Sequence, residues 1–203
     1  MQEEAGGRAP SRLTHSLCDE AKAVLSPEAL LLPDHVLVFI DRHAVTHGVY
    51  GWWFDHGLPL VPRDGCVEQD GKHLLYIGIA PSKGTSIKPG SPSPLKRRFQ
   101  RDHLRRVRGS TLRKSLAALL QRELDLQFRR DKGGKVGMDR CHEERLSAWI
   151  NQHAAISIAQ HDEPWRLEQE LVRHGPPLPL NIDMSDHPFK STLQDLRRAL
   201  GRN

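Results

Sequence analysis

Two segments rich in aromatic and β-branched residues constrain the fold more than any other feature of the sequence. Residues 48–54 and residues 73–80 both have the composition of strands, and a loop punctuated by Gly and Pro joins them over residues 57–71. Strands joined in this way most simply pair antiparallel. Residues 154–160 alternate around Ile156 and Ile158, which predicts a third strand.

Helical patterns follow the first two strands and surround the third. They are expected at residues 21–32, about 95–107, from Ser110 or Thr111 onward, at 142–152, at 162–174 with Asp162 as cap, and after the capping-box pattern Ser191 to Gln194. Residues 36–40 are apolar and β-prone. We therefore predict an α+β fold, with a loose N-terminal segment at 1–20 and a single domain at 21–203 that ends in a helix.

Several classes of protein are disfavoured by what the sequence lacks. The longest apolar stretches are far shorter than the roughly 20 residues of a membrane-spanning helix. The acidic start is unlike a secretory signal, and three scattered Cys residues have no metal-binding spacing. Neither a Gly-rich phosphate loop nor a Gly-x-Ser-x-Gly motif occurs. We expect a cytoplasmic protein with no membrane contact and no nucleotide cofactor.

Positive charge is concentrated in one segment. Residues 95–114 contain nine Lys and Arg against one acid, a balance of +8, whereas the whole chain carries +5. On a helix, Arg98, Arg101, Arg105 and Arg108 would recur at three- and four-residue steps and share a face. A local basic face is typical of proteins that bind a phosphate-rich partner, although it is also common on ordinary solvated surfaces. We favour a nucleic acid, with Arg97 and His103 as further contacts.

Five short motifs follow one another in a particular order along the chain. Gly48-Val-Tyr50 on the first strand is followed by Tyr76-Ile-Gly78 on the second, and Arg98 then lies on a helix. Glu168 lies on a later helix, and Asn181 follows a Pro-rich stretch. This order resembles that of the GIY-YIG nuclease superfamily. The resemblance covers roughly residues 36–181. It implies a small three-stranded antiparallel sheet flanked by helices.

The resemblance also implies roles for these residues. Tyr50, Tyr76, Arg98, Glu168 and Asn181 match the family's catalytic residues, and Glu168 matches its metal ligand. A carboxylate suits Mg²⁺ or Mn²⁺, and an arginine can hold phosphate oxygens without losing its charge. We assign Tyr50 as the base or water-orienting group and Tyr76 as a phosphate or water positioner. The implied function is metal-dependent endonucleolytic hydrolysis of DNA.

Alternatives remain open from the sequence. Members of the family often carry His or Tyr four residues after the arginine, but that position is Asp102 here and His103 comes one residue later. A catalytically inactive nucleic-acid-binding module of the same fold is the main alternative, and a binder of an acidic protein is another. Asp41, His43 and His47 would share a face in an extended chain, which is a weaker pattern for a metal site.

Overall fold

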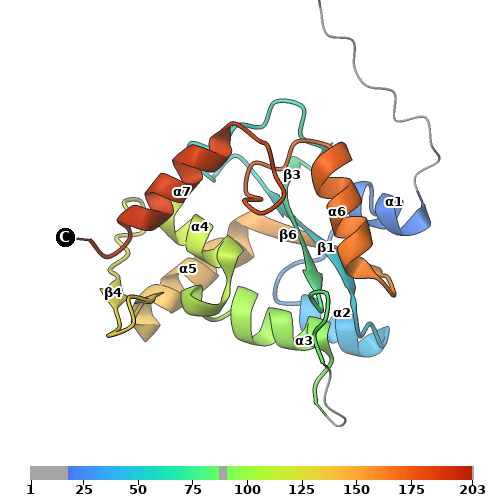
Figure 1. Cartoon of the computed structure of the whole chain (residues 1–203), viewed down its shortest axis with the longest axis horizontal. Helices are drawn as coiled ribbons and strands as arrows, with labels where there is room; N and C mark the ends of the chain where they lie inside the picture. The colour runs from blue at the N-terminus through green and yellow to red at the C-terminus, as the bar shows by residue number, and fades with distance from the viewer. Residues whose placement is uncertain (1–17, 87–90, 203) are drawn as a thin grey trace, which may run out of the picture.

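An antiparallel sheet forms the centre of the protein. The structure is a computed structural model that describes residues 18–86 and 91–202 (Figure 1). Four strands lie in the order β2-β3-β1-β6, with every pairing antiparallel. The strands are β1 (Gly48–Phe54), the short β2 (Glu68–Gln69), β3 (Lys72–Ala80) and β6 (Ala154–Gln160). The predicted α+β class and the three long strands are therefore confirmed, and β2 is an addition to them.

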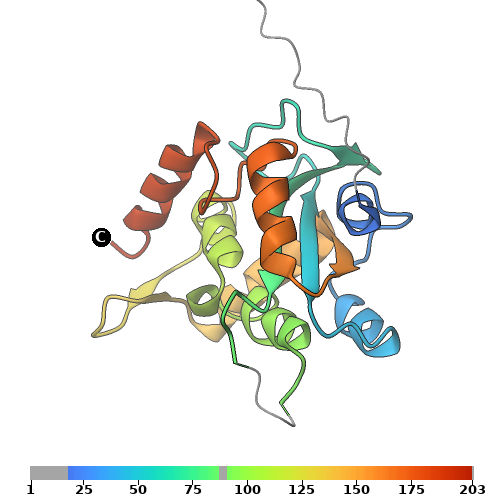
Figure 2. The same cartoon turned by 45° about the vertical axis from the view of Figure 1, so that its right-hand side comes forward.

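Helices cover both faces of this sheet. On one face, α1 (Asp19–Leu25) and α6 (Pro164–His174) bury Val24, Leu167 and Leu171 against Val49 and Trp53 (Figures 1 and 2). The other face carries the larger core, which includes Tyr50, Trp52 and Tyr76. The helices on that side are α2 (Val36–Arg42), α3 (Pro94–Arg97), α4 (Thr111–Leu119), α5 (Arg140–His153) and α7 (Phe189–Ala199).

The register of β1 and β3 places both tyrosines on one face. Tyr50 lies opposite Gly78, and Trp52 lies opposite Tyr76. The register then shifts, so that Trp53 pairs with Leu74. An inserted residue of this kind reverses the alternation. Simple alternation along β3 would place Tyr76 on the same face as Leu74. Because of the shift, Leu75 packs with Tyr76, and Leu74 packs in the opposite core.

Residues 36–40 form a helix and not a strand. Val36 and Ile40, four residues apart, are buried on one side of α2. A short apolar run fits a buried helix as well as a strand, so periodicity did not separate them. The extended face proposed for Asp41, His43 and His47 therefore does not exist, and Asp41 pairs with Lys96 at 2.7 Å. Among the described residues no group of three or more His, Cys, Asp or Glu could hold a metal ion.

The basic helix expected at 95–107 is broken into three pieces. α3 ends at Arg97, a π-helical turn follows over Arg98–His103 (η1), and a 3₁₀ turn over Val107–Gly109 (η2). The widened turn is closed by the Leu104 N–H, which donates to the Phe99 carbonyl at 3.1 Å. Residues at three- and four-residue steps therefore do not stack, and the predicted single arginine face is not formed.

Helix boundaries elsewhere differ from the expectation by a few residues. α6 runs to His174 as expected, but the Asp162 side chain bonds to His47 and does not cap the helix. α7 begins at Phe189, two residues before the expected capping box, with Pro188 as its N-cap residue. Residues 129–137 form a hairpin of β4 (Arg129–Arg130) and β5 (Val136–Gly137), turning at Gly134 with φ +74°. The predicted N-terminal segment 1–20 lies largely outside the described residues.

No helix within residues 18–86 and 91–202 combines the length and apolar character that a membrane crossing requires.

Candidate active site

A cavity of about 440 Å³ opens beside β3, beyond its short pairing with β2, where the two helical layers meet. Tyr76 comes from β3, Arg98 from the π-helical turn, and Glu168 from α6. Asn181 lies in the segment between α6 and α7. Four of the five residues expected from the sequence motifs therefore line one cavity, although they are spread over more than 100 positions of the chain.

Asn181 closes the edge of the sheet beside this cavity. Its Oδ1 accepts from the Ile77 N–H at 2.9 Å, and its Nδ2 donates to the Ile77 carbonyl at 2.8 Å. The Leu180 N–H also donates to the Leu75 carbonyl. The segment after α6 thus satisfies the backbone groups that an edge strand leaves unpaired. Asn181 fixes the position of Tyr76 through the neighbouring backbone.

Tyr50 lies beneath the cavity and is fully buried. Arg98 Nε donates to the Tyr50 hydroxyl at 3.2 Å, and His103 Nε2 lies 2.7 Å from the same oxygen. Burial is the main cause that raises the pKa of Tyr50, with Tyr76 adding to it, so Tyr50 is a neutral phenol. The Tyr50 hydroxyl is therefore held between a charged guanidinium and a buried imidazole.

The π-helical turn explains how His103 reaches Tyr50. His103 follows Arg98 by five residues, and the i to i+5 pattern of this turn brings it onto the same side of the helix. His103 is only 1% exposed, so it does not contact a ligand at the surface as expected from the sequence. Burial, and then the charges of Arg98 and Arg113, lower the pKa of His103 well below its usual value. A neutral imidazole results.

Arg98 is anchored from several sides. Nη1 donates to Asp102 Oδ2 at 3.1 Å and to the Gly109 carbonyl at 3.3 Å. The neighbouring Tyr50 and Tyr76 oxygens raise the pKa of Arg98, against the effect of burial. The guanidinium is therefore charged and held at the wall of the cavity, in a position to bind an anion.

The acidic side of the cavity is formed by Glu168 and Asp183. Glu168 forms no hydrogen bond or ion pair with any described residue. Burial raises the pKa of Glu168 to about 7, Asp183 adds to the increase, and Arg98 opposes it. Burial likewise raises the pKa of Tyr76 to about 12. An unpartnered carboxylate beside a second one, in a cavity open to solvent, fits a divalent cation that prefers oxygen ligands.

Two charged residues of the cavity were missed from the sequence. Lys83 and Asp183 line the cavity beside Glu168. Asp183 lies two residues after Asn181 in a segment without helical or strand pattern, and Lys83 follows β3 in a Gly- and Ser-containing loop. Neither position carries a motif, so only the fold could indicate them.

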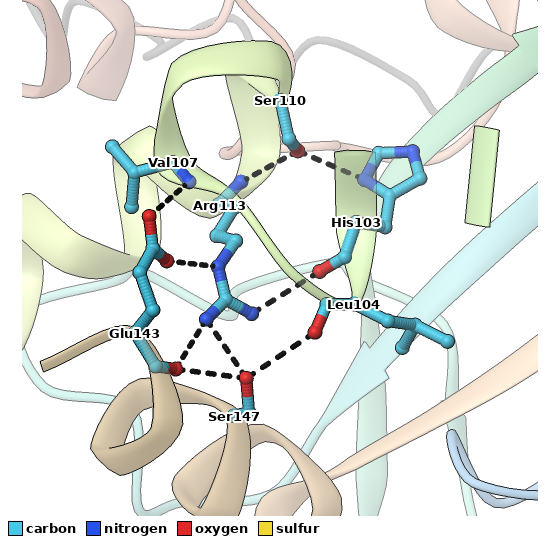
Figure 3. A network of polar contacts seen from close by, with 7 residues as sticks. All are labelled: His103, Leu104, Val107, Ser110, Arg113, Glu143 and Ser147. Carbon is cyan, nitrogen blue, oxygen red and sulfur yellow. Dashed lines mark hydrogen bonds and ion pairs between the residues drawn. The ribbon is translucent and has the colours of Figure 1, made fainter. Parts of the chain in front are cut away.

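A buried polar network supports the site from behind (Figure 3). Arg113 is 1% exposed and bonds Glu143, Ser147 and the His103 carbonyl. Ser110 Oγ accepts from the Arg113 backbone N–H at 3.0 Å and lies 2.9 Å from His103 Nδ1. Ser110 caps α4 as expected. The network ties the π-helical turn to α4 and α5, and thereby holds His103 under Tyr50.

The remaining arginines of the basic segment lie in different environments. Arg97, Arg101 and Arg105 are exposed. Arg108 Nη2 pairs with Asp131 at 2.6 Å, so part of its charge is already compensated. Arg97 also lines a smaller cavity of about 170 Å³ that shares Arg98 with the larger one.

Comparison with known proteins identifies the domain. Residues 48–199, more than half of the chain, match the family model of the GIY-YIG catalytic domain. No curated protein and no solved structure matches the chain significantly. The matched region begins at the first motif glycine of β1 and includes every residue of the cavity described above. The chain therefore belongs to the GIY-YIG catalytic domain family.

Proposed function

We propose that this protein is a metal-dependent endonuclease that hydrolyses phosphodiester bonds in DNA. The family is one of nucleases. The observation that carries the proposal is the convergence of Tyr76, Arg98, Glu168 and Asn181 on one cavity. This cavity combines a fixed cation with an unpartnered carboxylate, which are the groups that phosphodiester hydrolysis requires.

Glu168 would hold the metal ion. Asp183 is close enough to Glu168 to raise the pKa of its carboxyl group. A bound Mg²⁺ or Mn²⁺ supplies positive charge to phosphate oxygens and lowers the pKa of bound water. Arg98 binds the scissile phosphate from the opposite wall, because Asp102 and the Gly109 carbonyl keep its guanidinium in place.

The roles of the two tyrosines are assigned differently from the expectation based on sequence. Tyr76 lines the cavity, whereas Tyr50 is enclosed by Arg98, His103 and Phe99. Tyr76 is therefore the hydroxyl that orients water or phosphate. Tyr50 is a positioning residue that orients Arg98, and its contact with His103 holds the hydroxyl in place.

Exposed arginines next to the cavity are candidates for contacts with the DNA backbone. Arg97 lies in the adjoining small cavity, and Arg101 and Arg105 are exposed on the same irregular segment. The number of phosphates that these arginines contact sets how steeply DNA binding weakens with salt. The log–log slope of the binding constant against salt concentration changes by about 0.9 for each contact.

The test is nicking of supercoiled plasmid by the purified protein in Mg²⁺, in Mn²⁺ and in excess EDTA. We expect nicked and linear products in either metal and none in EDTA. DNA binding without cleavage in any divalent ion, with branched and single-stranded substrates included, would contradict the proposal and favour an inactive binding module.

A further inference from the structure

A second cavity, of about 590 Å³, lies between α4, α7 and the β4–β5 hairpin. In Figures 1 and 2 these three elements lie on the same side of the molecule, and α7 packs beside α4. The cavity is strongly basic, and Asp183 is the only acid in its lining. Its cationic residues are Lys114, Arg130, Lys135, Arg197, Arg198 and Arg202.

Part of this charge has a structural use. Arg130 donates to the carbonyls of Gly134, Arg198, Leu200 and Gly201, and so ties the end of α7 to the hairpin. Arg198 pairs with Asp195 at 3.1 Å. These contacts shape the cavity but leave the charge of Arg130 without an acidic partner.

The charged groups of Lys114 and Arg197 make no structural contacts of this kind. Neither forms an ion pair or a side-chain hydrogen bond with any described residue. Burial, and then Arg197 and Arg130, lower the pKa of Lys114. Burial also lowers the pKa of Arg197, while Asp183 and Tyr76 oppose that shift. Unneutralised cations held together in a concave site attract anions.

This basic cavity is continuous with the candidate active site. Thr111, Ile182 and Asp183 line both cavities. Thr111 is also the first residue of the nine-residue helix α4, whose amino-terminal end carries partial positive charge. An extended polyanion in the active-site cavity would therefore pass directly into the basic one.

We propose that the cavity between α4, α7 and the β4–β5 hairpin binds two backbone phosphates of the DNA strand that occupies the active site, one through Lys114 and one through Arg197. The proposal rests on the proposed function, because it takes DNA as the substrate. It makes the C-terminal helix part of the substrate-binding surface. The strand would run from Arg97 in the small cavity, past Arg98 and Glu168, to Lys114 and Arg197.

The test measures binding without cleavage. Fluorescence anisotropy of a labelled duplex is recorded against salt for the Glu168→Gln protein, alone and with Lys114→Gln plus Arg197→Gln. Two lost phosphate contacts should lower the magnitude of the log–log salt slope by about 1.8, at about 0.9 each. The matched control is Lys22→Gln plus Arg173→Gln, which removes two exposed charges on α1 and α6, and should leave the slope unchanged.

Equal slopes for the double variant and the control would overturn the proposal. Circular dichroism checks folding, and if the double variant unfolds, each single change should lower the slope by about 0.9. A double change that weakens binding of polyglutamate but not of DNA would assign the cavity to an acidic protein and contradict the proposal. A wild-type protein without nuclease activity would contradict the proposed function. The effect of Lys114 and Arg197 on the salt slope would still test the phosphate site.

Discussion

At the scale of single residues, the motif glycines are required by close packing. A Cβ added to Gly78 would lie 2.7 Å from the Tyr50 hydroxyl, because the Tyr50 ring crosses over this position. A Cβ on Gly48 would lie 2.0 Å from the Ala159 carbonyl oxygen of the neighbouring strand. Gly78 on β3 therefore makes space for Tyr50 on β1, whereas Gly48 allows β1 to approach β6 closely.

The two tyrosines should respond differently to loss of the hydroxyl group. Tyr50→Phe leaves His103 Nε2 and Arg98 Nε without this buried partner, which should cost about 1–3 kcal/mol of unfolding free energy. Tyr76→Phe should change stability little but lower single-turnover cleavage by about 10²–10⁴-fold. Urea unfolding and DNA cleavage measure the two effects. A Tyr76→Phe enzyme with the wild-type rate would exclude the proposed role of Tyr76.

His103 should make the protein sensitive to acid. Its pKa is lowered in the folded state by burial, Arg98 and Arg113, so the unfolded chain binds the proton more readily. The contribution of the neutral imidazole to the free energy of unfolding is therefore fully present above about pH 6.5. It is lost as the pH falls below that value, by at most about 1.4 kcal/mol per pH unit.

The matched variant for this effect is His103→Gln, which cannot titrate in this range. Urea unfolding between pH 7.5 and 5 should show a shallower loss of stability in His103→Gln than in the wild type. Parallel curves for the two proteins would show that His103 is not held neutral.

At the scale of elements, the sequence predicted the strands better than the helices. β1 matches its expected range and β3 differs by one residue, because aromatic and β-branched residues lie between clear turn signals. The π-helical turn could not be predicted, since the arginines at 98, 101 and 105 fit an ordinary helical period. Its cause is tertiary: Phe99 and His103 are buried against Tyr50.

Arg113 should be the most sensitive basic residue for stability, although the sequence only placed it within a basic run. Arg113→Met leaves the largely buried Glu143 carboxylate without its charged partner, which should cost about 3–5 kcal/mol. The matched control is Arg140→Met, because Arg140 forms a similar pair with Glu144 at the surface and should be nearly neutral. Thermal unfolding of both variants measures the two losses of stability. Similar losses in both would contradict the structural role of the network in Figure 3.

At the scale of the whole molecule, the site exists only where both helical layers meet beside β3, beyond its short pairing with β2. Residue order and family resemblance indicated Tyr76, Arg98, Glu168 and Asn181, and the fold brings them to one cavity. Asp183 and the basic cavity of α4 and α7 could not be predicted, because their residues are distant in sequence and carry no motif. Charge along the sequence indicated residues 95–114, whereas the fold joins Lys114 of that segment to cations from residues 130–202 in one cavity.

Metal binding should be visible without catalysis. An ion that binds only the folded state stabilises it by about 2.7 kcal/mol at 100 times its dissociation constant. Addition of Mn²⁺ to the EDTA-treated wild type should therefore raise the unfolding temperature. Glu168→Gln should lose this increase, because the cavity then lacks the carboxylate proposed to hold the ion. An equal increase in both proteins would place the metal elsewhere.

The most direct test of the proposed nuclease compares two glutamates on α6. Glu168 lines the cavity, whereas Glu170 is exposed and about 200° further around the helix. Cleavage and binding of the same DNA are measured for the wild type, Glu168→Gln and Glu170→Gln. We predict that Glu168→Gln binds DNA but does not cleave it in Mg²⁺ or Mn²⁺, and that Glu170→Gln does both. Normal cleavage by Glu168→Gln would contradict the account.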